Sequence, residues 1–180
     1  MEVNPSLIHR LFYPQVPLVM SARYRGRVSA MPVVSYASAS DKPPAVVVSC
    51  NPGGFTCKLA QKAGSFSLSI LDRGSIGAFA RLASVSGMKV KDKLADAGLR
   101  HKQGKALNVP VIDRALATLE CQLTGTRTIG DHIMLIGEVR AAYAASAFND
   151  FWDYSQYKPL LYAGWRDGMT TYPGPRRKSR

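Results

Sequence analysis

The chain of 180 residues lacks the features that mark membrane-spanning, secreted and metal-binding proteins. It has no continuous apolar run of the roughly 18 residues that cross a bilayer, and its N terminus lacks the positive and then apolar layout of a signal peptide. Its three cysteines cannot form a closed set of disulfides, and none lies in a CxxC pair or a Cys/His spacing that would hold zinc. These absences predict a cytoplasmic protein with reduced thiols, no metal centre and no membrane partner.

Acidic residues are also scarce, with 12 Asp and Glu against 24 Lys and Arg, so the formal net charge is +12. Four of the basic residues stand in the tail 176–180, which we expect to be disordered, and this leaves about +8 on the rest of the chain. No RRM, KH, zinc-finger or helix-turn-helix signature is present, nor an aromatic-interleaved basic stripe. The sequence therefore predicts no nucleic-acid partner, and a basic body suits small anionic ligands equally well.

The hydrophobic content of 46% is that of a globular protein, and residues 1–175 are long enough for one domain with a proper core. Residues 7–12 predict a short helix lying across this domain. Strands are expected at 18–24, 28–36, 45–48, 65–71, about 115–126 and 132–145, with helices at 56–62 and 75–83 and a less regular segment at 96–110. This order predicts an α+β fold built on a closed, barrel-like, mainly antiparallel sheet with inserted helices.

Three local patterns refine this expectation. Pro32 interrupts a predicted strand, which indicates an edge or a bulge, because proline cannot donate to a ladder. Residues 65–71 alternate between polar and apolar, so one face should be buried and the other wet. In the second helix Ile76, Phe79, Ala80 and Ala83 share one face and are expected to point inward.

The most informative stretch runs from Ala45 to Lys58, where a β-branched strand stops in a glycine-rich turn and a helix begins. We expect Thr56 to cap this helix and Gly64 to end it. A glycine-rich strand-to-helix turn presents free backbone N–H groups and the positive end of the helix dipole, which together form an anion site. Ser49, Asn51, Thr56 and Lys58 add polar donors, so a phosphomonoester would fit. A tight connection without a ligand would use much the same residues, and this reading stays open.

Cys50 and Cys57 flank this turn. An activated thiolate is conceivable there. The sequence favours the simpler interpretation that both are small, buried packing residues.

Several ordered segments resemble the flavin reductase-like FMN-binding split-barrel family, which includes flavoredoxins, ferric reductases and the reductase partners of two-component monooxygenases. The resemblance covers roughly residues 16–172. It rests on the segments GRVSAM at 26–31, KPPAV at 42–46, the turn at 49–58, FA at 79–80 with SG at 86–87 and DK at 92–93, ATLEC at 117–121, GDH at 130–132 with GEV at 137–139, and PLLY at 159–162.

The resemblance implies a split β-barrel that binds FMN without a covalent bond, usually at a homodimer interface. It implies that the strand 29–35 runs along the isoalloxazine ring, and that Asn51, Thr56, nearby N–H groups and either Lys93 or Lys58 meet the phosphate. The cofactor-binding residues implied in this way are Ser29, Ala30, Met31, Pro32, Ser35, Ser49, Cys50, Asn51, Thr56, Lys58, Ser86, Gly87 and Lys93.

Two positions depart from the family pattern. Many relatives have asparagine where this chain has Ser29, and a basic residue where it has Gly54. The loss of one charge-assisted hydrogen bond would weaken FMN binding by about 1.5–3 kcal/mol before any compensation by Lys58 or Lys93.

His132 is the catalytic candidate, because in related reductases this position lies close to where the nicotinamide stacks over the flavin. Its implied role is contact with NAD(P)H, since hydride passes directly between the two rings. The alternative is a surface histidine capped by Asp131. The aromatic residues Trp152, Tyr157, Tyr162 and Trp165 suggest a strap over a dimer partner or over the flavin rim.

The resemblance therefore predicts an FMN-containing oxidoreductase that uses NAD(P)H to reduce free flavin, a ferric chelate or a protein acceptor. A flavoredoxin-like electron carrier with little direct NAD(P)H activity is the second hypothesis. A fold that has lost FMN is a third and weaker one. The sequence does not distinguish NADH from NADPH.

Overall fold

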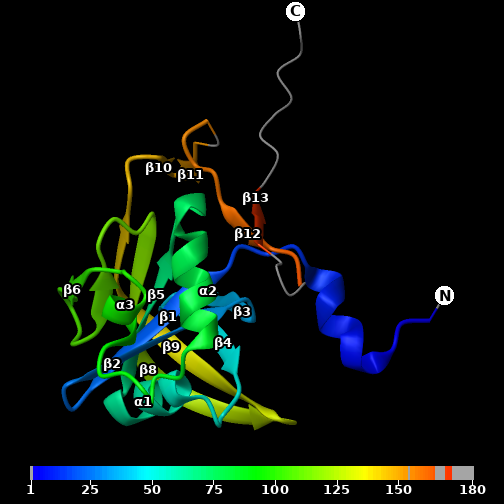
Figure 1. Cartoon of the computed structure of the whole chain (residues 1–180), viewed down its shortest axis with the longest axis horizontal. Coiled ribbons are helices and arrows are strands. Elements are labelled where there is room, and N and C mark those ends of the chain that lie inside the picture. Colours follow the sequence, from blue (N-terminus) through cyan, green and yellow to red (C-terminus); the bar gives the residue numbers. More distant parts are fainter. Residues whose placement is uncertain (1, 154, 165–168, 172–180) are drawn as a thin grey trace, which may run out of the picture.

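A computed structural model describes residues 2–153, 155–164 and 169–171 (Figure 1). The helical elements are η1 (Pro5–Phe12), α1 (Phe55–Ala63), η2 (Arg73–Ser75), α2 (Ile76–Ser84) and α3 (Lys93–Asp96). The strands are β1 (Leu18–Tyr24), β2 (Arg27–Val33), β3 (Tyr36–Asp41), β4 (Pro44–Cys50), β5 (Ser65–Ile70), β6 (His101–Gln103), β7 (Pro110–Ile112), β8 (Ala117–Ile129), β9 (His132–Ala144), β10 (Phe148–Asn149), β11 (Phe151–Trp152), β12 (Leu160–Tyr162) and β13 (Met169–Thr171). The basic tail and Trp165 lie outside the described residues.

Seven strands form one antiparallel sheet in the order β2-β1-β5-β8-β9-β4-β3. This confirms the α+β class and the mainly antiparallel arrangement with inserted helices. The expectation of a closed sheet is wrong for the described residues, because β2 and β3 do not pair and remain the two edges. Pro32 lies on edge strand β2, where its missing N–H breaks no ladder bond to a second neighbour.

Two hydrophobic clusters lie on opposite faces of β1. Leu18, Met20 and Ala22 pack in the cluster that includes α1, whereas Val19 packs in the one that includes α2 and α3. Helices on both sides therefore bury β1, as Figure 1 shows with α1 and α2 against different parts of the sheet.

One aromatic side chain reaches across a whole strand of the sheet. Phe66 of β5 is fully buried beneath Gly137 of β9, although β8 separates the two strands. A Cβ atom on Gly137 would lie 2.6 Å from Cζ of Phe66, so this contact requires glycine.

The segment predicted as one strand at 28–36 is divided. β2 ends at Val33, and the chain turns to form β3, which pairs with β4 through a two-residue connection at Lys42-Pro43. The polar, exposed character of β3 hid it from the hydrophobic pattern, because an edge strand needs little apolar surface.

The wet face expected for β5 is also wrong. The three serines of this face are buried: Ser65, Ser67 and Ser69. Ser67 donates to the Pro110 carbonyl, and Ser69 shares a 3.1 Å hydrogen bond with Thr118. The loop that ends in β7 covers this face. Hydroxyl groups that find hydrogen-bond partners nearby can be buried, even where the alternation of polar and apolar residues predicts a solvent-exposed face.

The N-terminal segment forms the 3₁₀-helix η1, and none of its residues is buried. It stands away from the sheet in Figure 1, and does not lie across the domain as predicted. Residues 96–110 contain no further helix: α3 ends at Asp96, and β6 pairs with β7 in a small hairpin.

Candidate functional site

A cavity of about 800 Å³ opens between edge strand β2 and the helices beside it. Its wall is formed by the end of β2, the start of α1, one face of α2, the loop after α2, and two tyrosines. The lining residues are Tyr13, Met31, Pro32, Val33, Val34, Gly54, Phe55, Thr56, Ile76, Phe79, Ala80, Leu82, Ala83, Ser86, Gly87, Lys93 and Tyr162.

The start of α1 supplies backbone donors at one end of this cavity. The N-cap is Gly54 and not Thr56 as expected, and no side chain caps the helix. Thr56 is the second helical residue, and Gly64 ends the helix in the left-handed conformation, as predicted. An uncapped helix N terminus leaves N–H groups and a positive partial charge available to an anion.

Ser29 and Gly87 support Thr56 from behind. The Oγ atom of Ser29 lies 2.8 Å from Oγ1 of Thr56, and both residues are buried. A Cβ atom on Gly87 would lie 2.3 Å from Oγ of Ser29 and 2.7 Å from the Phe55 ring. Only glycine lets the loop after α2 approach the helix start this closely.

Lys93 brings a cation to the same cavity. Its residue is only 6% exposed, and among the described residues no carboxylate lies within ion-pair distance of its ammonium group. Burial lowers the pKa of Lys93 from its ordinary value, while the charge of Asp96 acts in the opposite direction. A buried cation beside an open cavity would be stabilised by an anion bound there.

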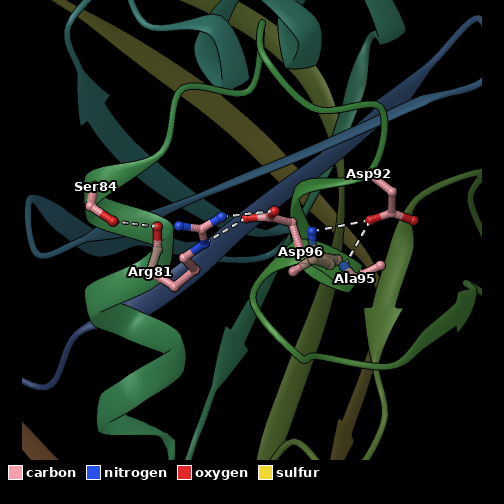
Figure 2. A network of polar contacts seen from close by, with 6 residues as sticks. Arg81, Ser84, Asp92, Ala95 and Asp96 are labelled. Atoms are coloured by element: carbon pink, nitrogen blue, oxygen red, sulfur yellow. Dashed lines mark hydrogen bonds and ion pairs between the residues drawn. The ribbon is translucent and has the colours of Figure 1, made fainter.

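Polar contacts fix the short helix α3 that carries Lys93. Asp92 caps α3 by accepting from the N–H groups of Leu94 and Ala95, and its other oxygen lies 2.7 Å from Nε2 of His101. Burial alone would raise the pKa of Asp92, but these hydrogen bonds lower it. Figure 2 shows the cap beside the ion pair of Arg81 with Asp96, at 2.9 Å, which joins α2 to α3.

Arg27 holds the loop between these helices. Its guanidinium donates to the carbonyl groups of Gly87, Met88 and Val90 at 2.9–3.0 Å, and it lies 5.2 Å from the centre of the Phe55 ring. One side chain at the start of β2 therefore fixes both the loop and an aromatic part of the cavity wall.

Six residues implied by the resemblance line the cavity together: Met31, Pro32, Thr56, Ser86, Gly87 and Lys93. Ser29 and Ala30 are buried directly behind its wall. The remaining implied cofactor residues, which do not line it, are Ser35, Ser49, Cys50, Asn51 and Lys58.

These remaining residues have other contacts. The N–H group of Ser49 donates to the Ser35 carbonyl at 2.8 Å, which joins β4 to the connection before β3. Oδ1 of Asn51 accepts from the Gly53 N–H group within its own turn. Lys58 is exposed on α1. Of the two lysines considered for the phosphate, Lys93 is the one on the cavity wall.

His132 lies away from this cavity, at the first position of β9 after the Gly130-Asp131 turn. Its Nδ1 atom is 2.8 Å from Oδ1 of Asp131, and this hydrogen bond lowers the pKa of Asp131. The contact with NAD(P)H implied for His132 stays a prediction.

Sequence reasoning named Met31, Pro32 and Tyr162 but missed the part of the apolar wall that α2 and Tyr13 form. Ile76, Ala80 and Ala83 were expected in the core, yet they are exposed and face the cavity, while Phe79 and Leu82 are the buried residues of α2. Tyr13 and Tyr162 meet edge to face, with ring centres 5.0 Å apart. Helical spacing finds an apolar face but does not say whether protein or ligand covers it.

Within the described part of the chain, no cluster of three or more His, Cys, Asp or Glu could hold a metal ion. No helix in that part is both long and apolar enough to cross a membrane.

Comparison with known proteins gives sequence matches over most of the chain. The family described as "Flavin reductase like domain" matches residues 9–168. An uncharacterised protein of Aeropyrum pernix is 33% identical over 175 residues, which are 97% of this chain and 65% of that protein. The flavin reductase (NADH) of Kitasatospora aureofaciens is 31% identical over 137 residues, which are 76% of this chain and 63% of that protein. The alignments thus span less than two thirds of the length of either relative.

Solved structures share the fold over nearly the whole chain. An FMN-binding protein from Thermus thermophilus with bound p-hydroxybenzaldehyde is 30% identical, with a TM-score of 0.81 over 97% of this chain and 94% of that one. Flavoredoxin from Methanosarcina acetivorans is 22% identical, with a TM-score of 0.81 over 99% of this chain and 96% of that one.

Proposed function

The chain belongs to the flavin reductase-like family, and we propose that it is an FMN-dependent oxidoreductase. It passes hydride or electrons from NAD(P)H through FMN to free flavin, a ferric chelate or a protein acceptor. The FMN-binding protein of Thermus thermophilus and the flavin reductase (NADH) of Kitasatospora aureofaciens support flavin and NADH as the ligand classes.

The observation that carries this proposal is the coincidence of three features in one cavity. An uncapped helix N terminus, a buried lysine without a carboxylate partner in the described chain, and a long apolar wall open into the same space of about 800 Å³. A phosphate needs the first two features and a flat, largely apolar ring needs the third.

Different residues of the cavity would bind the phosphate and the ring of FMN. Thr56, the N–H groups at the start of α1 and Lys93 would hold the phosphate. Met31, Pro32 and the end of β2 would lie along the ring, because Met31 and Pro32 line the cavity and β2 has no second strand neighbour in the described chain. The start of β2 is covered, since the Val28 N–H group donates to the Lys91 carbonyl. FMN, when bound, supplies the hydride-accepting chemistry, and the chain contributes orientation and hydrogen bonds to the ring edge.

A homodimer is part of the proposal. Leu11 and Phe12 of η1 are 66% and 67% exposed, and Phe151 is 83% exposed, so large apolar side chains are available to a second copy. Light scattering of the purified protein measures this directly, and a monomer at micromolar concentration would contradict it.

The second candidate function is an electron carrier that exchanges electrons with another protein and oxidises NAD(P)H poorly. The likeness to flavoredoxin concerns the fold, and it fits this candidate as well as the first. The carrier would use the same FMN site.

One experiment separates the candidates. The visible spectrum of the purified protein, loaded with FMN, is recorded without oxygen before and after NADH or NADPH is added. Bands that bleach within seconds support the reductase, whereas bands that persist with both donors and bleach with dithionite support the carrier. If added FMN neither binds nor changes its spectrum, the cofactor assignment is wrong.

The proposed role of His132 has its own test. His132→Ala should slow flavin reduction by NADH while FMN affinity stays unchanged, because His132 does not line the cavity proposed for FMN. Rapid-mixing kinetics measures the rate, and fluorescence titration measures the affinity. An unchanged rate would leave His132 as a turn residue paired with Asp131.

A further inference from the structure

Two cysteines meet beside the turn that precedes α1. Cys50 ends β4 and Cys57 lies in the first turn of α1, so only residues 51–56 separate them. Their Sγ atoms are 2.9 Å apart, and the two residues are 5% and 0% exposed. Sulfur atoms joined in a disulfide are about 2 Å apart. A small movement of two side chains would therefore bring these thiols to bonding distance.

We propose that Cys50 and Cys57 are a redox-active pair that closes a reversible disulfide across the turn 51–56. The juxtaposition carries this proposal, because the Cys50 thiol donates a hydrogen bond to the Cys57 sulfur and the two atoms that a disulfide would join already face each other. A disulfide here would tie the end of a strand to the start of a helix, both of which the sheet and the core already hold in place.

The surroundings of Cys57 suit it to be the attacking thiol. The hydrogen bond from the Cys50 thiol lowers the pKa of Cys57; burial acts in the opposite direction, while the Gln61 amide, 3.5 Å away, and the charge of Lys58 lower it further. A thiolate is the reactive form of cysteine. Cys50 then serves as the resolving thiol.

The reaction balances with hydrogen peroxide as the two-electron oxidant. The Cys57 thiolate attacks one peroxide oxygen, the O–O bond breaks, and with one proton a sulfenic acid and one water form. The Cys50 sulfur then attacks the Cys57 sulfur, the S–O bond breaks, and the oxygen leaves as a second water. Two thiols and one peroxide give one disulfide and two waters, and a dithiol reductant reverses the oxidation by exchange.

Cys121 provides a control inside the same molecule. It is fully buried on β8, and burial raises the pKa of its thiol to about 12. Among the described residues no other cysteine sulfur lies in contact with its own. Cys121 should therefore stay a thiol under conditions that oxidise the pair.

The test follows the thiols by mass. The full chain is reduced, freed of reductant, treated with a small excess of hydrogen peroxide, and then denatured in N-ethylmaleimide and digested with trypsin. The pair falls within the peptide 28–58, because trypsin does not cleave the Lys42-Pro43 bond, and Cys121 falls within the peptide 115–127. We expect the first peptide to be unlabelled and two hydrogen atoms lighter than its dithiol form, and the second to be labelled once.

Two serine variants and their matched control sharpen the result. Cys50→Ser and Cys57→Ser should abolish the lighter peptide, whereas Cys121→Ser should retain it. Labelling of both thiols in peptide 28–58 after oxidation would overturn the proposal. So would a link to Cys121, or oxygen addition to one cysteine without a disulfide. Because wild-type protein gives the primary result and no flavin is needed, the proposal stands or fails independently of the proposed FMN activity.

Discussion

A single buried lysine separates this cavity from an ordinary apolar groove. Lys93 sits on the cavity wall with little solvent and with no carboxylate at ion-pair distance in the described chain. A cation in such a position costs free energy unless something neutralises it. The cost is understandable if the lysine is held ready for an anionic ligand.

This reasoning predicts that Lys93→Met weakens FMN binding by roughly 10- to 100-fold, the effect of losing one charge-assisted hydrogen bond of about 1.5–3 kcal/mol. The unfolding free energy should not fall, because methionine fills the same space without a buried charge. Lys58→Met is the matched control, since Lys58 is exposed on α1 and should change affinity by less than about fivefold. Fluorescence titration with FMN measures both variants. If both variants lost the same FMN affinity, the proposal that Lys93 binds the phosphate would be wrong.

At this scale the sequence named three polar residues, one glycine and three apolar or aromatic residues of the cavity wall and missed the apolar residues that α2 contributes. Thr56, Ser86, Gly87 and Lys93 belong to short motifs, and a motif preserves spacing that can be recognised without coordinates. The face of α2 that was predicted to point inward is apolar, but most of it lines the cavity instead of the protein core. Whether a ligand or a side chain covers such a face depends on neighbours distant in sequence, such as Tyr162.

Among the elements, the loop between α2 and α3 matters most for the site, because it carries Ser86 and Gly87 and leads directly into Lys93. Its large apolar residue Met88 is 69% exposed and does not anchor it. The Arg27 side chain holds the loop in place, together with the Asp92 cap and the Arg81–Asp96 ion pair that Figure 2 shows. The Asp92 cap is local, but the Arg27 and Arg81–Asp96 contacts join residues 60–63 and 15 positions apart, so no local pattern predicts these two.

Removal of the guanidinium in Arg27→Ala should free this loop. We expect faster amide hydrogen exchange at residues 87–91, weaker FMN binding and a loss of about 2 kcal/mol of unfolding free energy, because hydrogen bonds from a charged donor to three carbonyl groups disappear. Lys89→Ala, an exposed change within the same loop, is the control and should alter none of these. If exchange at 87–91 is unchanged in Arg27→Ala, another contact holds the loop.

The strand predictions succeeded for long strands with a clear apolar pattern and failed for strands that are polar or very short. β1 was predicted to the residue and β9 within one residue, since both carry apolar side chains into the core. β3 and the small β6–β7 hairpin were missed, because backbone pairing holds them and their side chains are largely polar or lie in short runs. Pro32 indicated the edge at β2, but the failure of the whole sheet to close was not predicted, since closure depends on how strongly the sheet curls.

At the scale of the whole molecule, the buried carboxylate of Glu120 makes the free energy of unfolding depend on pH in acid. Glu120 is fully buried on β8 and accepts from the N–H groups of Lys105, Ala106 and Leu107 and from the Tyr143 hydroxyl. Burial would raise the pKa of Glu120, but these four donors lower it. The Glu120 carboxylate therefore binds the loop at residues 105–107 to this face of the sheet.

A depressed pKa in the folded state means that Glu120 stabilises the fold above the pKa of an unfolded glutamate, about 4.3, and that this stability is lost as the pH falls through the lower folded value. Glu120→Gln should cost about 3 kcal/mol at neutral pH, because an amide nitrogen would face backbone donors. Urea unfolding measured from about pH 7 to about pH 3 checks this: the gap between wild type and variant should narrow in acid. A gap that stays constant with pH would show that the charge of Glu120 does not matter.

The contact of Phe66 with Gly137 also has a consequence for how this sequence can diverge. A side chain cannot be added at 137 while the phenylalanine ring fills the space beneath it, and a smaller residue at 66 leaves a void while 137 remains glycine. A side chain at 137 therefore requires a smaller residue at 66, whereas the void left by a smaller residue at 66 costs stability without a clash. The two residues, 71 positions apart in the chain, are thus expected to vary together in related sequences.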